Sequence, residues 1–434
     1  LRSNFMKNLL KTITLVGILG TLVTIDPASA AEAKLDTGDT AWLLTSTAIV
    51  LLMTIPGVAL FYAGMARKKN VLSILMQSFT ITCLISIIWM VAGYSLAFSK
   101  GGNDYVGNLD FAFLDHLTTG AINGTIPDSL FVVFQMTFAI ITAALITGAL
   151  AERMKFSALL WFVGLWSIIV YSPVTFWVWG GGFLGNAGVL DFAGGTVVHI
   201  NSGVAALVAC IMLGKRKGYG VENLAPHNLV LTVIGGSLLW VGWFGFNAGS
   251  ALGANGGAAM AMTVTQIAAA AAGLTWMLIE WVIQKKPTVL GIVSGAVAGL
   301  VAITPAAGFV GPKGALAIGI LAGLICFWGA TVLKHKLKYD DSFDVFAVHG
   351  LGGITGAVLT GVFAVEAIGG TAGALEGNIS QISTQLYGIA ATIIWSAVAT
   401  AIIIFIVDKT IGIRVDKDSE AEGLDLNQHG EMIH

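Results

Sequence analysis

Eleven apolar segments, each about as long as a membrane-spanning helix, divide this 434-residue chain. A helix needs roughly 20 apolar residues to cross the hydrocarbon core of a bilayer, and eleven such segments in one chain are typical of a membrane protein. The composition agrees, because only 11% of the residues are charged, against about 25% in a soluble domain. The sequence therefore predicts an all-α polytopic membrane protein with eleven transmembrane helices.

The predicted spans follow one another along most of the chain. They cover approximately residues 40–63, 71–98, 129–150, 157–177, 196–213, 228–246, 258–283, 289–304, 314–333, 345–365 and 386–407. The eighth is short, and Gly291, Gly295 and Gly299 follow one another along it in steps of four. Small residues at that spacing let helix backbones approach closely.

Both ends of the chain lie outside these segments. A basic start near Lys7 and Lys11, an apolar run to Ile25 and a small-residue pattern around Ala31 are typical of a secretory signal. We therefore predict three parts. Residues 1–31 are a signal peptide with upstream residues, 32–408 are the transmembrane domain, and 409–434 are a polar, acidic-rich cytoplasmic tail.

Positive charge predicts the orientation in the membrane. Most of the 22 Lys and Arg residues fall in six clusters that lie on one side of an eleven-span arrangement. The clusters are Arg67/Lys68/Lys69, Arg153/Lys155, Lys215/Arg216/Lys217, Lys285/Lys286, Lys334/Lys336/Lys338 and Lys409/Arg414/Lys417. By the positive-inside rule, the mature N-terminus is outside and the C-terminus is cytoplasmic.

Two stretches carry a histidine into a span. The first, residues 191–203, begins with an aspartate and carries His199 two helical turns further in; the second, residues 344–353, begins with an aspartate and carries His349. Each histidine follows a valine and is followed four residues later by a glycine. The two lie in spans five and ten. Because five is odd, a duplicated half inserts upside down, so helices 1–5 and 6–10 are predicted to form an inverted repeat.

The spans are almost empty of carboxylates and amines at depth, where a proton-coupled transporter usually places one. His199 and His349 are the polar groups there. Imidazole donates and accepts hydrogen bonds, and two facing rings can share a proton, which suits a small neutral hydride such as ammonia or water. The alternative is a pair of helix-packing histidines bonded to nearby backbone.

Aromatic residues cluster toward the outer ends of several spans. Trp179 precedes three glycines, Phe134 and Phe138 lie one turn apart in span three, and Phe246 and Ser250 lie at the end of span six. Singly, each is more often packing than function. Together, aromatic faces and a hydroxyl can hold a partly dehydrated cation, with a cation–π attraction of roughly 2 kcal/mol.

Asp191, at the start of span five beside two glycines, is an N-terminal cap and helix-dipole partner. It also adds a fixed negative charge near the outer mouth, which favours a cation there.

Several classes of function are disfavoured. No basic stripe suggests a nucleic-acid partner, and Cys83, Cys210 and Cys326 are isolated in apolar segments, so they indicate neither disulfides nor metal ligands. No nucleophile–base pair or metal cluster accompanies the histidines. We therefore predict neither an enzyme nor a bound cofactor.

Four motifs together resemble one known family. They are the aspartate-to-asparagine stretch 191–201, Gly-Ala-Leu-Ala-Glu-Arg-Met at 148–154, Trp-Phe-Gly-Phe-Asn-Ala-Gly-Ser at 243–250 and Asp-Val-Phe-Ala-Val-His-Gly at 344–350. With the tail at 425–431, they closely resemble the Amt/Mep/Rh ammonium transporters, and the bacterial Amt branch is the nearest. The resemblance covers the whole mature chain. It implies eleven helices per subunit, a homotrimer, and one pore through each subunit of an inner-membrane protein.

The resemblance also implies a role for each candidate residue. Trp179, Phe138 and Ser250 resemble the outer ammonium-recruiting site, which Phe134 closes on one side and Asp191 supports through structure and electrostatics. Phe138 and Phe246 resemble a stacked gate, His199 and His349 the pore lining, and Thr304 a threonine lower in the pore. The acidic tail resembles the region through which bacterial members meet PII-type nitrogen regulators.

The predicted function is therefore nitrogen uptake by an ammonia channel: ammonium is recruited outside, loses its proton near the gate and crosses as ammonia. The alternative is an ammonium sensor that signals through its tail and a PII-type protein with little flux. A gas channel of the Rh type is disfavoured because Trp179 and Ser250 supply a cation site.

Overall fold

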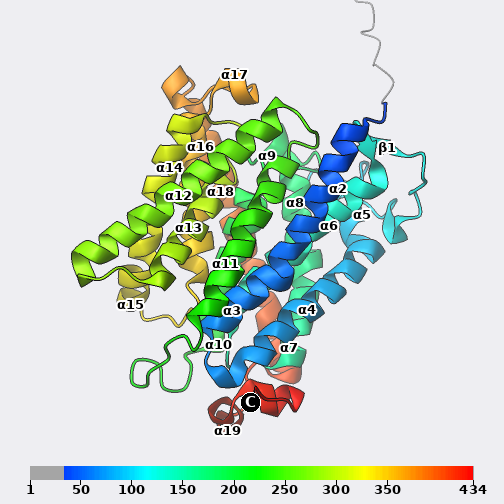
Figure 1. Ribbon diagram of the computed structural model, residues 1–434. Helices are drawn as coiled ribbons and strands as arrows, with labels where there is room; N and C mark the ends of the chain where they lie inside the picture. Colours follow the sequence, from blue (N-terminus) through cyan, green and yellow to red (C-terminus); the bar gives the residue numbers. More distant parts are fainter. Residues whose placement is uncertain (1–33, 434) are drawn as a thin grey trace, which may run out of the picture.

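The computed structural model of the protein describes residues 34–433, and almost all of their regular structure is helical (Figure 1). Ten helical segments in this part of the chain are long and apolar enough, by length and composition, to cross a membrane. A helix satisfies its own backbone hydrogen bonds, which an apolar solvent requires. The prediction of an all-α polytopic membrane protein is confirmed. The predicted signal peptide lies outside the described residues.

The first six segments match the expected spans closely, but several join α-helical and π-helical turns. Their bounds are α2 Thr37–Leu52, η1 Met53–Val58 and α3 Ala59–Met65; η2 Lys68–Asn70, α4 Val71–Ile88, η3 Trp89–Gly93 and α5 Tyr94–Phe98; α6 Asp128–Leu150; α7 Phe156–Trp166, η5 Ser167–Tyr171, α8 Ser172–Val178 and α9 Phe183–Asn186; η6 Gly195–Ile200 and α10 Asn201–Leu213; α11 Leu229–Trp243 and η7 Phe244–Ala248.

The remaining segments complete the bundle. Their bounds are α12 Gly256–Gln284; α13 Val289–Ile303; α14 Pro312–Trp328, η8 Gly329–Leu333 and α15 Lys334–Leu337; η9 Phe346–Leu351 and α16 Gly352–Phe363; and α18 Ser380–Ile411. Short α17 Glu366–Gly369 and η10 Ala374–Glu376 connect α16 to α18, and the tail forms α19 Lys417–Glu422 and η11 Asp425–His429.

The eighth expected span is α13, which has only 15 residues and falls short of the length of the other ten. Its glycines pack as their spacing predicts. A Cβ on Gly295 would lie 2.6 Å from the Cβ of Trp276 in α12, and one on Gly299 would lie 2.6 Å from the Cβ of Ala272. Only a hydrogen fits at these positions, so α13 lies directly against α12.

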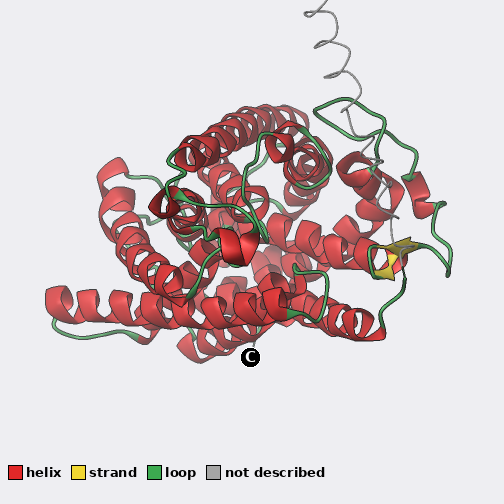
Figure 2. Ribbon diagram, turned by 90° about the horizontal axis from the view of Figure 1, so that it is seen from above, coloured by secondary structure: helices red, strands yellow, loops and turns green. Residues whose placement is uncertain are grey.

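The long connection at 99–128 carries a short hairpin at the upper end of the molecule in Figure 1. After the single turn η4, Ala112–Leu114, strand β1 (Ile122–Asn123) pairs antiparallel with β2 (Ile126–Pro127). From above, the helices stand around the centre of the molecule and the hairpin lies at its edge (Figure 2). The segments that carry the histidines, η6 and η9, are largely buried within the bundle.

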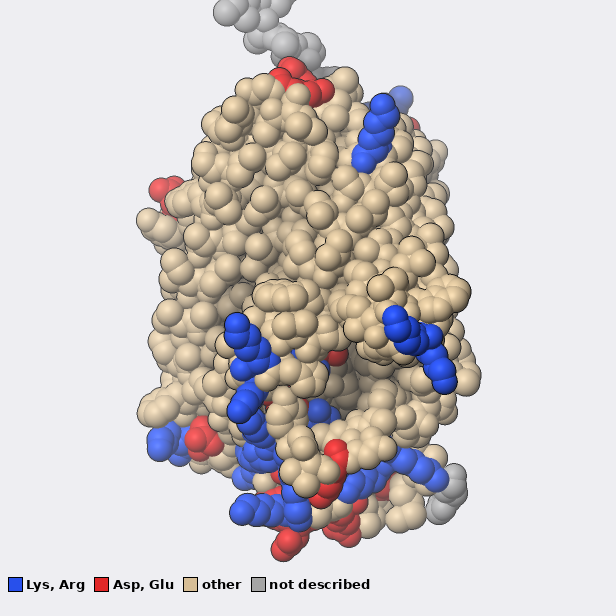
Figure 3. All heavy atoms as spheres, turned by 90° about the vertical axis from the view of Figure 1, so that its left-hand side faces the viewer, with Lys and Arg blue, Asp and Glu red and all other residues tan. Residues whose placement is uncertain are grey.

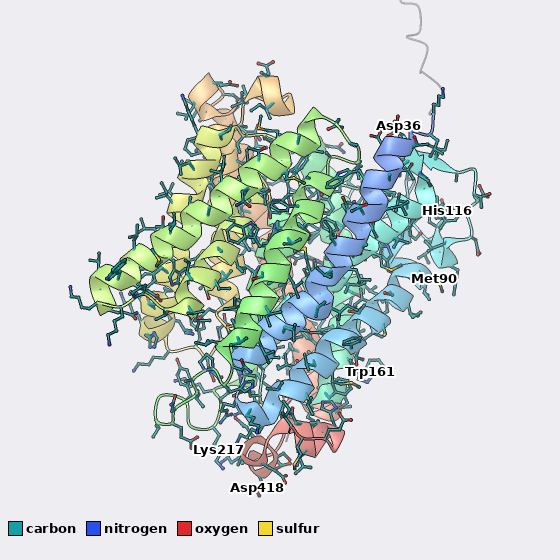
Figure 4. All side chains as sticks on the ribbon, in the orientation of Figure 1. Asp36, Met90, His116, Trp161, Lys217 and Asp418 are labelled. Atoms are coloured by element: carbon teal, nitrogen blue, oxygen red, sulfur yellow. The ribbon has the colours of Figure 1, made fainter. Side chains whose placement is uncertain are left out.

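The opposite, lower end carries the tail and most of the basic residues seen in Figure 3. Lys and Arg gather toward that end on the face shown in Figure 3, and Lys217 and Asp418 both lie there in Figure 4. The tail is anchored to this end of the molecule, although many of its residues are exposed. The Asp425 carboxylate accepts hydrogen bonds from the backbone N–H groups of Leu72 (3.0 Å) and Ser73 (2.7 Å), and Glu420 accepts from Lys217 N–H at 2.6 Å.

A buried ion network joins the loops at this lower end. Glu152, from the motif at 148–154, forms ion pairs with Arg67 (2.8 Å) and Arg216 (3.4 Å), and Arg216 also pairs with Asp340 at 2.8 Å. Burial alone would raise the pKa of Asp340, but hydrogen bonds from Arg216 and the charge of Arg153 hold that pKa below its usual value. The network fixes the loops around the lower ends of α3, α6 and α10.

Candidate functional site

The two histidine segments touch at their glycines. A Cβ on Gly203 of α10 would lie 2.5 Å from the Cα of Gly350 in η9, and one on Gly353 would lie 3.1 Å from the backbone nitrogen of Ile200 in η6. The glycine four residues after each histidine is therefore a crossing point. Because no side chain separates the backbones there, the two imidazole rings are brought to the same level of the bundle.

The imidazoles of His199 and His349 meet through their Nδ1 atoms, which are 3.1 Å apart. Both rings are buried, with centroids 5.2 Å apart and planes inclined by 23°. One Nδ1 donates a proton and the other accepts it, so the two rings hold complementary tautomers. The pairing predicted from the sequence is therefore a direct side-chain contact in the structure.

Phenylalanine rings cover this pair on the side toward the hairpin end. Phe138 from α6 and Phe246 from η7 are stacked, with centroids 4.2 Å apart and planes inclined by 23°. Phe246 lies 5.9 Å from the His199 ring, and Phe134 contacts Phe138 edge-to-face at 5.0 Å. All of these rings are buried. The stacked pair therefore packs against the histidine pair through Phe246.

Trp179 and Ser250 lie near these rings and are only partly buried. Trp179 stands edge-on to Phe138 at 6.0 Å, and its indole N–H donates to the Asp191 carbonyl at 2.8 Å. The Ser250 hydroxyl donates to the Phe246 carbonyl at 2.8 Å. Its only proton is thereby used, so its lone pairs are left to accept from another donor.

The Asp191 carboxylate is fully occupied by backbone. It accepts from four consecutive N–H groups at 2.6–3.0 Å, those of Gly194, Gly195, Thr196 and Val197. This caps η6 and fixes its first turn, as the predicted N-terminal cap requires. Asp191 thus acts on its surroundings through structure and charge.

The aspartate corresponding to Asp191 before the second histidine is Asp341 and not Asp344, the residue that the sequence comparison had paired with it. Asp341 lies eight residues before His349, as Asp191 does before His199. It is buried, and it accepts from the backbone N–H of Phe346 at 2.7 Å. Asp344 instead has φ of 60° and pairs with Lys334.

Asp341 and Asp191 differ in their remaining oxygen. The Oδ1 atom of Asp341 is buried and has no hydrogen-bond partner within residues 34–433. Burial, and then the nearby charge of Asp344, raise the pKa of Asp341 to about 6, against opposing effects of Lys334 and the N–H groups of Phe346 and Val345. This carboxyl therefore changes its charge near physiological pH.

Two small cavities continue from the histidines. The first, about 10 Å³, is lined by both histidines, Trp243, Phe246 and apolar residues. The second, about 30 Å³, extends from His349 to Asp344. A cavity of roughly 10–15 Å³ holds one water-sized molecule. The cavity next to the histidines is therefore large enough for about one water-sized molecule, and its walls are mostly apolar.

Thr304 lies buried at the end of α13, where its oxygen accepts from the Trp243 indole N–H at 2.9 Å. Trp243 itself lines the first cavity. Neither Trp243 nor Asp341 is among the site residues that the sequence predicts, although Trp243 begins the motif at 243–250 and Asp341 repeats an eight-residue spacing. In the described part of the chain, no group of three or more His, Cys, Asp or Glu side chains is arranged to hold a metal ion.

Comparisons with known proteins bear on this site. The family model described as Ammonium Transporter Family matches residues 41–434. An ammonium transporter of Aquifex aeolicus is 49% identical over 423 residues, covering 96% of this chain and 99% of its own length. The crystal structure of Saccharomyces cerevisiae Mep2 is similar with a TM-score of 0.84 and 37% identity, covering 89% of each chain. A structure named Sensor Amt Protein has a TM-score of 0.84 at 29% identity, covering 90% of this chain and 98% of its own.

Proposed function

Because the chain belongs to the ammonium transporter family, we propose that this multi-pass membrane protein recruits ammonium at its hairpin end, removes a proton and conducts ammonia along the histidine pair. The observation that carries this mechanism is the succession of a stacked phenylalanine pair, a direct imidazole contact and an apolar cavity of about 10 Å³. Each of these three features suits a small molecule that carries a charge at the hairpin end and is neutral in the cavity.

Recruitment uses the partly buried groups above the stacked rings. Trp179, Phe134 and Phe138 offer aromatic faces that attract a cation. The Ser250 oxygen, whose proton is held by the Phe246 carbonyl, accepts a hydrogen bond from ammonium. Asp191 supports the site from behind, since its four backbone hydrogen bonds leave it no free oxygen for direct contact.

Deprotonation follows from the closure below this site. Phe138 and Phe246 lie in contact and are buried, and the cavity beyond them is largely apolar. Taking an ion into such a space costs several kcal/mol, whereas a neutral amine enters far more easily. Ammonium crosses after losing its proton to a separate route, and K⁺, which has no proton to lose, is excluded.

The histidine pair gives that proton a route and ammonia a polar contact. With the Nδ1 atoms 3.1 Å apart, one ring takes up a proton at its free Nε2 and passes its Nδ1 proton to the other ring. That ring releases the proton on its own Nε2, so one proton is carried across and the two tautomers are exchanged. Ammonia both donates and accepts hydrogen bonds, so it can follow the same polar edge. Two isolated packing histidines would have no reason to meet in this way.

We also propose the larger arrangement that the sequence predicts. The basic residues at the lower end support a cytoplasmic location for that end, with the hairpin end outside the inner membrane. The π-helical segments η6 and η9, each carrying a histidine and each preceded by a buried aspartate, support the inverted repeat. The division at 31 and 408, a homotrimer and a PII-type partner at the cytoplasmic tail remain part of the proposal.

The test is ammonium uptake into liposomes that contain the wild type, His199→Ala or His349→Ala. We expect each variant to lose most of its ammonia flux or to admit K⁺, because either change breaks the imidazole contact and widens the path. Current measured together with ammonium flux tells whether charge and amine move together. Unchanged flux and unchanged ammonium-over-K⁺ selectivity in both variants would contradict the proposed role of the histidine pair.

A sensor is the second candidate, because the chain is similar in fold to a protein named as a sensor. Its tail also contacts two regions at the lower end: Asp425 the start of α4, and Glu420 and Arg414 the end of α10 and the segment that follows it. Ammonium binding without flux in the intact protein would favour this function. Full transport after removal of 409–434, in a variant that stays monodisperse, would favour a transporter whose tail only regulates.

A further inference from the structure

The indole of Trp243 forms one wall of the cavity between the stacked phenylalanines and the histidine pair, and the proposed function gives it no role. Its ring centroid lies 5.4 Å from that of His199, with planes inclined by only 19°, and 5.5 Å from that of Phe246. It is almost completely buried. Trp243 therefore contacts both the gate and the first histidine of the pair.

The orientation of this indole is fixed by a short chain of hydrogen bonds. The Thr304 hydroxyl donates its proton to the Leu300 carbonyl at 2.8 Å, so its oxygen faces Trp243 as an acceptor. The indole N–H donates to that oxygen at 2.9 Å. Both buried polar groups therefore have hydrogen-bond partners. The indole N–H is bonded to Thr304 at the end of α13.

His199 depends on Trp243 for its orientation. The torsion that turns an imidazole about its Cβ–Cγ bond is broad, so neighbouring contacts decide the ring angle. The Nδ1 atom of His199 bonds to His349, while its Nε2 has no hydrogen-bond partner among the residues that the structure describes. Trp243 and Phe246 are aromatic neighbours of this ring, and the indole is the closer and more nearly parallel of the two.

We infer that Thr304 is a positioning residue of the pore, which acts through Trp243 to hold the His199 ring with its Nδ1 against that of His349. The inference rests on the proposed function, since it assigns a task within the same path. Thr304 itself need not touch ammonia. The Thr304 hydroxyl fixes the orientation of the Trp243 indole, and the indole fixes the orientation of the His199 imidazole. The imidazole then makes the polar contact with His349.

Thr304→Val tests this inference, because it replaces the hydroxyl by a methyl group of similar shape. We expect ammonium flux in liposomes to fall by about tenfold, the equivalent of one lost hydrogen bond. We also expect weaker ammonium-over-K⁺ selectivity and a changed pH profile of flux, because a free indole no longer holds His199. Thr304→Ser keeps the hydroxyl and should recover most of the loss.

Trp243→Phe provides the partner experiment. It keeps an aromatic face but removes the N–H, so it breaks the same hydrogen bond from the other side. If Thr304 acts through the indole, the double variant Thr304→Val/Trp243→Phe loses no more than the more impaired single variant. Losses that add would overturn the coupling. Should Thr304→Val fail to fold, wild-type flux and selectivity in Trp243→Phe would overturn the inference alone.

The matched control is Thr360→Val. Thr360 is also fully buried and its hydroxyl donates to the carbonyl four residues back, Gly356, at 2.8 Å, without a side-chain partner in the described residues. It should keep the selectivity and the pH profile of the wild type. Wild-type liposomes without ammonium uptake would overturn the proposed function itself, whereas wild-type uptake with an unaffected Thr304→Val would overturn only this inference.

Discussion

The carboxylates of Asp191 and Asp341 occupy the same place before the two histidines, yet they are bound very differently. Asp191 accepts four backbone N–H groups, whereas Asp341 accepts from Phe346 and keeps a buried oxygen without a partner among residues 34–433. The same eight-residue spacing therefore gives one carboxylate with hydrogen bonds to both oxygens and another with an unpaired oxygen. Similar spacing fixes the place of a group but not its chemistry.

The difference has an electrostatic consequence. Four charge-assisted hydrogen bonds favour an ionised carboxylate. Burial has the opposite effect on both carboxyls: it raises the pKa of Asp191 despite these hydrogen bonds, and it raises the pKa of Asp341, which has fewer of them, to about 6. We expect the charge of Asp341 to respond to pH near 6.

The largest expected effect is that of Asp191→Asn. An asparagine keeps one acceptor oxygen but turns an amide N–H₂ toward two of the four backbone donors. Each lost bond to a charged acceptor is worth about 1.5–3 kcal/mol, so the free energy of unfolding should fall by about 3 kcal/mol or more. Thermal unfolding in detergent measures this. A variant as stable as the wild type would show that the four bonds do not anchor η6.

Asp341→Asn should have a smaller effect at neutral pH and can be stabilising, because it removes a buried charge while its oxygen still accepts from Phe346. Wild-type stability has a distinct pH dependence. The folded pKa of about 6 lies above the unfolded value of 3.8, so the folded state binds the proton more tightly and loses up to about 3 kcal/mol as pH rises through that window.

The measurement for Asp341 is the difference in unfolding midpoint between wild type and Asp341→Asn across pH 4–7. Subtracting the two curves removes the other titrating groups. We expect the variant to gain relative to the wild type as pH rises. A constant difference would mean that Asp341 is not titrating in this range, and the contrast with Asp191 would then be one of hydrogen bonding alone.

The smallest expected effect is that of Asp344→Asn. Asp344 is about one-third exposed and pairs with Lys334, and ion pairs of that kind contribute about 0–1 kcal/mol. Asparagine also tolerates the positive φ of 60° at this position. Stability should change little, and less at high salt. A loss as large as that of Asp191→Asn would restore Asp344 as the counterpart of Asp191.

The sequence predicted the helical spans well because a bilayer imposes a local rule. A segment either has enough apolar residues to cross or it does not, and the expected span 129–150 differs from α6 by one residue. The eighth span was harder to predict, since α13 is short and lies directly against α12 through Gly295 and Gly299. Its glycine spacing nevertheless indicated that packing.

The candidate site was predictable where a motif places a residue directly and not where a side chain finds a distant partner. His199, His349 and Phe246 lie in motifs that predict a role for them, and the structure brings them together with Phe138. The hydrogen bond between Trp243 and Thr304 joins residues 61 positions apart. No local pattern in the sequence predicts which of the many buried threonines accepts a hydrogen bond from the Trp243 indole.

By itself, the sequence determined an all-α membrane protein, the places of its spans and the two histidines, because lipid acts on each segment separately. Only the tertiary structure decided which groups meet. Glycine packs against glycine where η9 crosses α10, and the two imidazoles, 150 positions apart, meet directly. The Asp191 carboxylate has hydrogen bonds to both of its oxygens, whereas one oxygen of Asp341 has none in the described residues. Hydrophobicity is a property of a segment. A hydrogen bond or an unpaired oxygen depends on where two distant backbones come to lie.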